Sequence, residues 1–384
     1  MLFQLSEEQQ MIQQAARDFA KNECLPGVIE RDEQQKFPYD QVMKLADLGF
    51  MGMMVSPEYG GAGLDTVSYV LAMEEISKID ASVSVCMSVN NSLVCYGLQQ
   101  YGTEEQKQKY LVPLAQGKKD GKLYIGAFML SEPEAGSDAT SQRTIAEDMG
   151  DHYLLNGTKN WITNGSTASA YLVMAQTDAS KGSKGINCLI VEKDWPGVTI
   201  AAKENKLGIR GSDTTTVMFT DVKVPKENRI GEDGFGFKFA MKTLAGGRIG
   251  IASQALGIAS GSYELAKEYA KTRKAFGTEI MNHQAIAFKL ADMATKVEAA
   301  RLLCLKAAWE KDNHMDYTLS SSMAKVYASE TAMWNSVEAV QIHGGYGYVK
   351  EYHVERLMRD AKITQIYEGT SEVQRIVISR SILK

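Results

Sequence analysis

The sequence changes its hydrophobic pattern twice, and this change limits the folds that it can adopt. From about residue 6 to 120, and again from about 235 onward, apolar residues recur at helical spacing. Between these regions, β-prone residues gather in short runs that Gly, Asn, Asp and Pro separate. The runs are 124–130, 152–155, 171–175, 187–191, 198–201 and 216–220. Their spacing predicts a compact antiparallel β-domain between two helical regions.

We therefore expect a multi-domain α+β protein. It has an N-terminal α-helical domain at 1–122, a middle antiparallel, β-barrel-like domain at 123–232 and a C-terminal four-helix-bundle domain at 233–384. A length of 384 residues suits two or three domains. The glycine-rich segments 231–236 and 344–347 lack the GxGxxG spacing between a strand and a helix, so a Rossmann domain is disfavoured.

Charge and composition exclude several functional classes. The net charge of −5 argues against nucleic acid as the principal partner. No segment approaches the roughly 18 uninterrupted apolar residues that cross a bilayer, and the start, MLFQLSEEQQ, is acidic where a targeting peptide is basic. The five cysteines are scattered, and the five histidines form no metal-binding pattern. We expect a soluble cytoplasmic protein without a disulfide framework, a metal or a membrane anchor.

A candidate catalytic group lies near the C-terminus, in the segment QIYEGTSEVQ at 365–374. Glu368 stands between an aromatic residue, Tyr367, and a glycine that permits another molecule to approach closely. A carboxylate that takes a proton from carbon must be partly desolvated, so that its pKa rises, and must face a substrate. Glu368 is thus a candidate general base. A loop glutamate before a helix capped by Thr370 is the alternative.

Two segments of the expected β-domain carry groups that suit a planar polar ring. The strand at 128–138, FMLSEPEAGSD, runs into hydroxyls and small residues, although a polar turn is the alternative. Trp161 and Thr163 are two residues apart in a β-run, which places them on one face of the strand. An aromatic plate beside a hydroxyl could stack on a heterocycle and bond to its edge. A tryptophan buried in the core is the other reading.

Seven segments in order resemble the acyl-CoA dehydrogenase family, and the likeness extends over essentially the whole chain. They are AFMLSEPEAGSD (127–138), LNGTKNWITN (155–164), KLGIRGSDT (206–214), GRIGIASQALGIA (247–259), RKAFG (273–277), QIHGGYGY (341–348) and IYEGTSE (366–372). The chain is most similar to short-chain, butyryl-CoA-type members. The resemblance implies non-covalent FAD, an acyl-CoA substrate, electron-transferring flavoprotein as electron acceptor, a role in fatty acid β-oxidation and a homotetramer built as a dimer of dimers.

The resemblance also implies roles for single residues. Glu368 would remove the α-proton of the thioester while the β-hydride passes to flavin N5. Arg273 would neutralise the FAD pyrophosphate, and part of the cofactor would be reached from a neighbouring subunit. The implied FAD-binding residues are Phe128, Leu130, Ser131, Trp161, Ile162, Thr163, Arg273, Phe276, Gln284, Gln341, Ile342, His343, Gly344, Gly345, Thr370, Ser371 and Glu372. The implied substrate-binding residues are Ser137, Ala245, Arg248 and Gly369.

Departures within the family refine these expectations. Some branched-chain members carry the base just before the arginine of the earlier helix, where this chain has Gly247, so Glu368 is the expected base. The family usually has an aspartate at the position of Ala245, which leaves one CoA contact open. The floor of the acyl pocket is expected near 89–96. A medium- or branched-chain acyl-CoA dehydrogenase is the alternative, and the direction, butyryl-CoA oxidation or crotonyl-CoA reduction, stays open.

Overall fold

The N-terminal part of the chain is helical in the computed structural model, which describes residues 4–383. Ser6 and Thr103 each stand three residues before a glutamine, a spacing that predicts a capping box at a helix start. Both are capping boxes: Ser6 Oγ accepts from Gln9 N at 3.1 Å, and Thr103 Oγ1 accepts from Gln106 N at 3.3 Å. The helices are α1 (Glu7–Phe19), α2 (Val28–Glu33), α3 (Tyr39–Asp47), α4 (Thr66–Ser77), α5 (Ala81–Ser88), α6 (Tyr96–Tyr101), α7 (Glu104–Gln106) and α8 (Val112–Gln116).

Helix α5 continues as a π-helix, η4 (Val89–Cys95), and two buried asparagines hold this wider turn in place. Asn90 Nδ2 donates to the carbonyls of Met51 and Leu114 at 2.8 and 2.9 Å. Asn91 Oδ1 accepts from the backbone N–H of Met53 at 2.8 Å. The π-helical turn is thus bonded to neighbouring backbone, which fixes its side chains against the rest of the protein.

The middle of the chain forms a sheet of eight strands within the described residues. In spatial order they are β10 (Arg229–Ile230), β7 (Ile186–Glu192), β6 (Ala170–Gln176), β4 (Ile145–Asp148), β5 (His152–Thr163), β9 (Thr214–Pro225) and β8 (Val198–Lys203), with β3 (Gly126–Met129) beside β6. Each of the six predicted runs overlaps a strand. A small hairpin, β1 (Lys118–Lys119) with β2 (Lys122–Leu123), precedes the sheet.

The expectation of a purely antiparallel sheet is wrong at two pairings. Strand β3 runs parallel to β6, with Gly126 opposite Ala170, and β4 meets β6 in parallel at Ile145 and Gln176. The connection from β3 to β6 contains β4 and β5, and it is long enough for the crossover that parallel pairing needs. We did not predict strand β4 from the sequence. Ala146 is the one buried residue of this strand, so the strand has almost no alternation of hydrophobic and polar residues.

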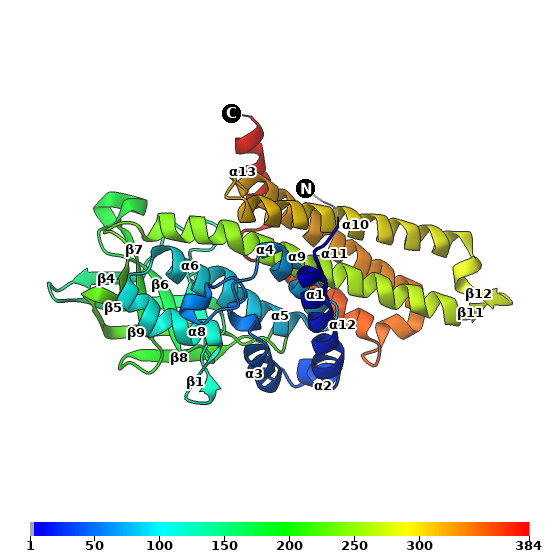
Figure 1. Ribbon diagram of the computed structural model, residues 1–384, viewed down its shortest axis with the longest axis horizontal. Helices are drawn as coiled ribbons and strands as arrows, with labels where there is room; N and C mark the ends of the chain where they lie inside the picture. The colour runs from blue at the N-terminus through cyan, green and yellow to red at the C-terminus, as the bar shows by residue number, and fades with distance from the viewer. Residues whose placement is uncertain (1–3, 384) are drawn as a thin grey trace.

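The C-terminal part is a bundle in which α11 packs against α9, α10, α12 and α13. The helices are α9 (Gly236–Thr272), α10 (Gln284–Asp312), α11 (Thr318–His343), α12 (His353–Thr364) and α13 (Ser371–Ile382). Helix α9 has 37 residues, so it is about 55 Å long. It runs from the sheet to a distant hairpin of β11 (Lys274–Ala275) and β12 (Thr278–Glu279), and α13 projects from the bundle (Figure 1).

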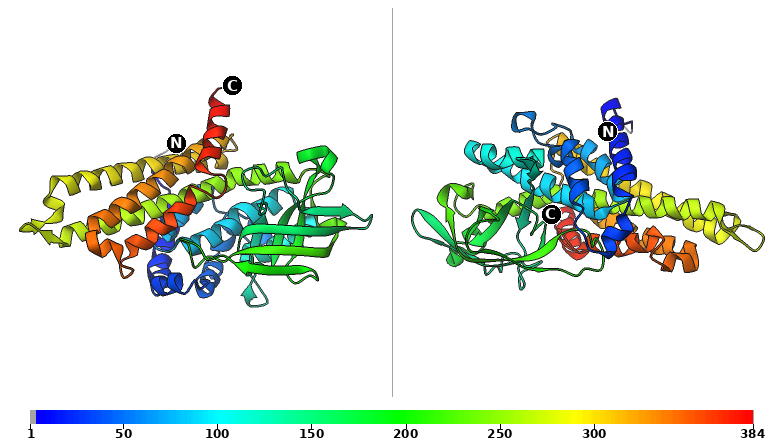
Figure 2. Two further views of the ribbon diagram at one scale, coloured as in Figure 1. Left: turned by 180° about the vertical axis from the view of Figure 1, so that it is seen from behind. Right: turned by 90° about the horizontal axis from the view of Figure 1, so that it is seen from below.

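Sheet and bundle lie at opposite ends of an elongated molecule, with the N-terminal helices packed along it (Figure 2). Along the chain, a helical part, a sheet and a second helical part follow one another, which agrees with the predicted fold class. Among the described residues, no helix has both the length and the apolar character that crossing a membrane requires. The five cysteines are all buried and unpaired.

Candidate active site

Glu368 lies in the short loop that joins α12 to α13, and bonds within the loop fix its backbone. Gln374 Nε2 donates to the carbonyls of Glu368 and Gly369, both at 3.0 Å. Thr370 caps α13 by accepting from Val373 N at 3.2 Å. Glu368 has φ +51°, a left-handed conformation that residues with side chains seldom adopt. Such strain is typical of functional loops that the surrounding structure holds in place.

One oxygen of the Glu368 carboxylate is buried and has no hydrogen bond to the described residues. The residue as a whole is half-buried, but Oε2 is buried and has no partner among the described residues. This oxygen lies against α9 at Gly247, where an added Cβ would come within 2.2 Å of Oε2 and 2.7 Å of Leu93 Cδ2. Burial raises the pKa of Glu368 to about 7, although Lys325 and Arg248 act to lower it. The absent side chain at Gly247 therefore makes the room that the carboxylate occupies.

Two cations lie near this carboxylate, but neither bonds to Oε2. Lys325 Nζ donates to the carbonyl of Gly369 at 2.7 Å, and burial lowers the pKa of Lys325 to about 8. Arg248 Nη1 donates to Ser322 Oγ at 3.4 Å. Both charges favour the ionised form of Glu368 from a distance, which leaves Oε2 free to take a proton. We did not predict Lys325; the signal that identifies it is a lysine that directly follows a helical run of mostly small residues, 320–324.

Tyr367, which precedes the candidate base, is tied to the core of the protein. Its hydroxyl donates to Gln254 Oε1, and Gln254 Nε2 donates to the carbonyl of Ala81 at 2.8 Å. Burial raises the pKa of Tyr367 well above its ordinary value. Tyr367 therefore stays neutral and links the base loop through α9 to the start of α5.

The two candidate ring-binding segments of the sheet lie side by side. Asn160 N donates to the carbonyl of Ser131 at 2.9 Å. Trp161 is 60% exposed and has φ +62° at an irregularity in β5, so it is a surface residue and not part of the core. Ile162 is buried, whereas Thr163, Phe128, Leu130 and Ser131 are half-buried.

A buried ion pair that we did not predict joins these segments. Lys159 Nζ contacts Glu132 Oε1 at 2.7 Å and the carbonyl of Leu130 at 3.1 Å. Glu132 also accepts from the backbone N–H groups of Arg143 and Thr144 at 2.6 and 3.1 Å. These bonds fix the segment after β3 against β5, beside Trp161. No local sequence pattern predicts the pair, because its members are 27 residues apart.

A second group of candidate residues surrounds an open cavity of about 520 Å³ at the far end of the bundle. The predicted residues that line it are Arg273, Ile342, His343, Gly344 and Gly345. The Arg273 guanidinium lies 5.4 Å from the centre of the Tyr346 ring and has no ion pair within residues 4–383. A Cβ added at Gly344 or Gly345 would meet no atom within 4 Å. An unpaired cation over open, glycine-lined space suits a pyrophosphate.

The other predicted residues divide between the two ends. Phe276 is 99% exposed at the distant hairpin, and Gln284 and Gln341 are exposed nearby at helix ends. Thr370, Ser371 and Glu372 follow the base loop, where Ser371 is buried and Glu372 exposed. Ser137 is exposed in the loop after β3, Ala245 is half-buried on α9, and Arg248 is buried.

One chain does not bring the two groups together. Gly247 beside the base lies on α9, and Arg273 at the cavity caps the C-terminal end of the same helix, 26 residues further on, which is about 40 Å along the helix axis. The base and the ring-binding segments thus lie toward the sheet, and the cation and glycines lie at the opposite end. Within one chain, the two groups therefore do not share one site.

Comparison with family models finds three matches along the chain. The N-terminal domain of acyl-CoA dehydrogenase matches residues 6–118, the middle domain residues 127–222 and the C-terminal domain residues 234–383.

Relatives match over the full length. A short-chain specific acyl-CoA dehydrogenase of Clostridium acetobutylicum is 50% identical over 384 residues, which is 100% of both chains. The caffeyl-CoA reductase-Etf complex subunit CarC of Acetobacterium woodii is 49% identical and covers 99% of each chain. Among solved structures, butyryl-CoA dehydrogenase from Megasphaera elsdenii has a TM-score of 0.97 at 48% identity, with 100% of each chain covered. A chain from work on the electron transferring flavoprotein of Acidaminococcus fermentans has a TM-score of 0.98 at 49% identity, again with full coverage.

Proposed function

The chain belongs to the acyl-CoA dehydrogenase family, and from that premise we propose that it is an FAD-dependent dehydrogenase of short-chain acyl-CoA thioesters with Glu368 as its base. The observation that carries the proposal is Glu368 Oε2, which is buried, has no hydrogen-bond partner and belongs to a carboxyl group with a pKa of about 7. A base with a pKa near the working pH combines a useful ionised fraction with the ability to accept a proton.

The protein contributes proton transfer and polarisation of the thioester. Glu368 Oε2 takes the α-proton, and burial favours the neutral acid that results. An α-proton is weakly acidic, so the thioester carbonyl must accept hydrogen bonds as negative charge develops on it. The backbone N–H of Glu368 has no acceptor among the described residues, so it is available to donate to this carbonyl. When bound, the flavin of FAD accepts the hydride from the β-carbon.

The chemistry of the residues proposed to bind FAD suits both ends of the cofactor. Phe128, Leu130, Ser131, Trp161, Ile162 and Thr163 would hold the ring, because they place an exposed aromatic plate and polar groups side by side. Arg273, Phe276, Gln284 and the residues 341–345 would hold the pyrophosphate and adenosine. Because α9 separates these sets by about 40 Å, we propose that each FAD is shared between two chains of a homotetramer. Thr370, Ser371 and Glu372 would contact it beside the base.

The preferred acyl chain is short in this proposal. Leu93 of η4, within the segment 89–96 expected to form the floor of the acyl pocket, lies beside Gly247, because a Cβ added there would come within 2.7 Å of Leu93 Cδ2. Relatives named short-chain specific and butyryl-CoA dehydrogenase support the same choice. Arg248, Ala245, Gly369 and Ser137 would line the path of the thioester.

A second candidate is the reverse reaction, reduction of an enoyl-CoA. The 49% identical relative is a subunit of a caffeyl-CoA reductase-Etf complex. The same base and flavin serve both directions, and the electron-transferring flavoprotein that we propose as partner would decide between them. Measuring the reaction in both directions with a purified partner flavoprotein distinguishes the two candidates.

The test is anaerobic mixing of the yellow holoenzyme with saturated acyl-CoA thioesters of increasing length. We expect butyryl-CoA to bleach the flavin fastest. Glu368→Gln should bind FAD but bleach at least about 10³-fold more slowly, because an amide cannot accept the proton. An unchanged bleaching rate in this variant would remove Glu368 from the mechanism. A colourless protein that binds no acyl-CoA would overturn the whole proposal.

A further inference from the structure

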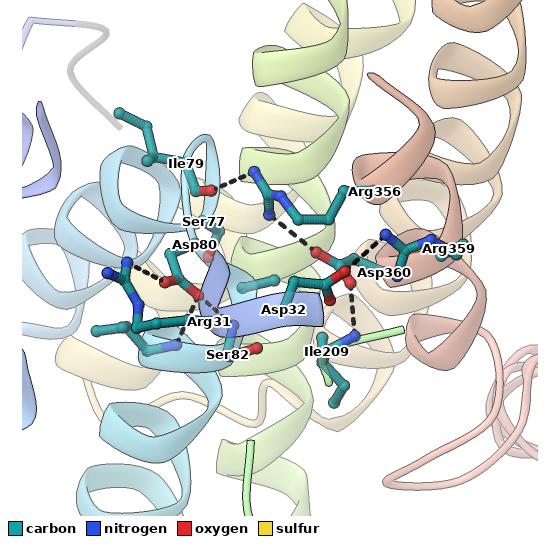
Figure 3. A network of polar contacts seen from close by, with 12 residues as sticks. Arg31, Asp32, Ser77, Ile79, Asp80, Ser82, Ile209, Arg356, Arg359 and Asp360 are labelled. Atoms are coloured by element: carbon teal, nitrogen blue, oxygen red, sulfur yellow. Dashed lines mark hydrogen bonds and ion pairs between the residues drawn. The ribbon is translucent and has the colours of Figure 1, made fainter. Parts of the chain in front are cut away.

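Helix α12 ends four residues before Glu368 and carries a buried polar cluster (Figure 3). Arg356 Nη1 contacts Asp360 Oδ2 at 3.1 Å, and Arg356 Nη2 donates to the carbonyl of Ile79 at 2.7 Å. Asp360 Oδ1 accepts a hydrogen bond from the backbone N–H of Ile209. Arg356 and Asp360 are 4% and 1% exposed. Asp360 therefore joins three parts of the chain: α12, the helical region around Ile79 and a loop of the β-domain.

The loop that Asp360 holds, residues 206–213, is strained and closely packed. Ile209 has φ +41°, which is unfavourable for a β-branched residue unless its surroundings impose it. A Cβ at Gly208 would come within 2.2 Å of the Arg359 carbonyl oxygen. The loop backbone thus touches the backbone of α12, and the bond to Asp360 stabilises the conformation that this contact requires.

The same loop continues to the segment that follows Trp161 and Thr163. Asp213 accepts from the N–H groups of Ser166 and Thr167, both at 2.8 Å, and its carbonyl accepts from Asn164 N at 2.7 Å. The loop 206–213 is therefore bonded to Asp360 at Ile209 and, four residues further along the chain, to the end of the ring-binding strand at Asp213. In the other direction, α12 leads directly to Glu368.

The cluster has little room to rearrange. Arg359 Nη2 contacts Asp32 at 2.7 Å, and Arg31 contacts Asp80 at 3.1 Å. The cavity among these groups is about 10 Å³, which is room for about one water molecule. A shift of α12 would therefore have to break ion pairs and cannot be absorbed by empty space.

We propose that Asp360 is a positioning residue that sets the separation between the base, Glu368, and the strand segment around Trp161. This inference rests on the proposed function, in which a substrate lies between those two groups. In this proposal, Asp360 touches neither substrate nor cofactor. It acts by fixing the position of α12 relative to the loop 206–213. Because proton and hydride transfer both depend on this separation, a small shift should slow the reaction more than it weakens binding.

The test compares Asp360→Asn with Glu74→Gln in the holoenzyme. Glu74 is 1% exposed and pairs with Arg301 at 2.6 Å, so this control also removes a buried carboxylate from an ion pair, but one between α4 and α10. In Asp360→Asn we expect faster hydrogen exchange in both 206–213 and 364–372, and in Glu74→Gln in neither. We also expect the limiting rate of flavin reduction by butyryl-CoA to fall about 10- to 100-fold with little change in KM.

The outcomes separate this inference from the proposed function. Faster exchange in only one of the two segments, or in neither, overturns the positioning role, as does an unchanged reduction rate per bound flavin. If Asp360→Asn does not accumulate as folded holoenzyme, Arg356→Lys decides, because it keeps the charge but lacks the two separate nitrogens with which Arg356 reaches Asp360 and the Ile79 carbonyl. A wild-type protein whose flavin no acyl-CoA reduces would overturn the proposed function, while the exchange measurement would still test the coupling.

Discussion

Two glutamates in this protein, Glu132 and Glu368, have opposite surroundings: Glu132 is buried as a whole, and Glu368 is half-buried with a buried Oε2. Glu132 accepts bonds from Lys159 and two backbone N–H groups. Burial alone would raise its pKa, but the charge and bond of Lys159 hold the pKa of Glu132 below the ordinary value. Glu368 has a buried lysine nearby too, yet Lys325 bonds to the Gly369 carbonyl instead, and the pKa of Glu368 is raised to about 7.

Under the proposed function, one residue type serves structure at one site, Glu132, and chemistry at the other, Glu368. A carboxylate whose lone pairs are filled by donors is stable as an anion and cannot accept a proton at neutral pH. A carboxylate that keeps an unpaired buried oxygen is costly to fold but can act as a base. At Glu132 the neighbouring lysine bonds to the carboxylate itself, whereas beside Glu368 the lysine bonds to the Gly369 carbonyl. This choice of partner separates the anionic carboxylate from the one that can accept a proton.

The largest expected difference is between the free energies of unfolding of two variants, Lys159→Met and Lys325→Met. Lys159→Met leaves Glu132 buried without its counter-ion and should lower the free energy of unfolding by about 3–5 kcal/mol. Lys325→Met removes a bond to a carbonyl and should cost about 1 kcal/mol. Urea denaturation of both variants measures the contrast. Equal losses would show that the two lysines play the same part.

The next effect concerns the room that Gly247 leaves for Glu368. Gly247→Ala would place a Cβ 2.2 Å from Oε2 and so displace the carboxylate; we expect flavin reduction to slow about 100-fold. Gly246→Ala is the matched control, because its Cβ would be 3.7 Å from the nearest atom, Lys311 Nζ. Single-turnover rates should separate the two. A similar rate in both variants would contradict the placement of the base.

A smaller effect is the loss of folding stability that the buried, ionised Glu368 causes. Its pKa is raised from 4.5 to about 7, so the folded state binds more protons than the unfolded state between these values. Stability should therefore fall as pH rises from about 4.5 to 7 and stay level above. Glu368→Gln removes this loss, so at pH 8 the variant should be about 1–3 kcal/mol more stable than the wild type, with no difference near pH 4.5. Urea unfolding of both proteins at both pH values measures this difference. A variant that is less stable than the wild type at pH 8 would contradict the raised pKa of Glu368.

The smallest effect is a shift of the pH profile. Because the base must be ionised, kcat/KM should fall about tenfold per pH unit below about 7 and level off above. Lys325 lowers the pKa of Glu368, so Lys325→Met should move this profile to higher pH by up to about 1 unit. A shift to lower pH would show that Lys325 does not act on Glu368 through its charge.

The features that the sequence predicted depend on residues close together in the chain. The capping boxes at Ser6 and Thr103, the six strand runs and the helical regions all follow from local spacing. The pairs that hold the candidate site in shape do not: Glu132 and Lys159 are 27 residues apart, and Ile209 and Asp360 are 151 apart. Parallel pairing of β3 with β6 is equally non-local. Glu368 could be proposed as a base from its neighbours, but the space for its carboxylate depends on a glycine of another helix.

The length of α9 has a consequence for the protein in dilute solution. If its two ends serve different copies of the cofactor, each chain acts as part of the other's ligand-binding site. Apparent FAD affinity then depends on protein concentration by mass action, although no contact to the flavin changes. On serial dilution with fixed free FAD, the FAD that stays with the protein after removal of free cofactor should decrease more steeply than total protein, and it should return on concentration.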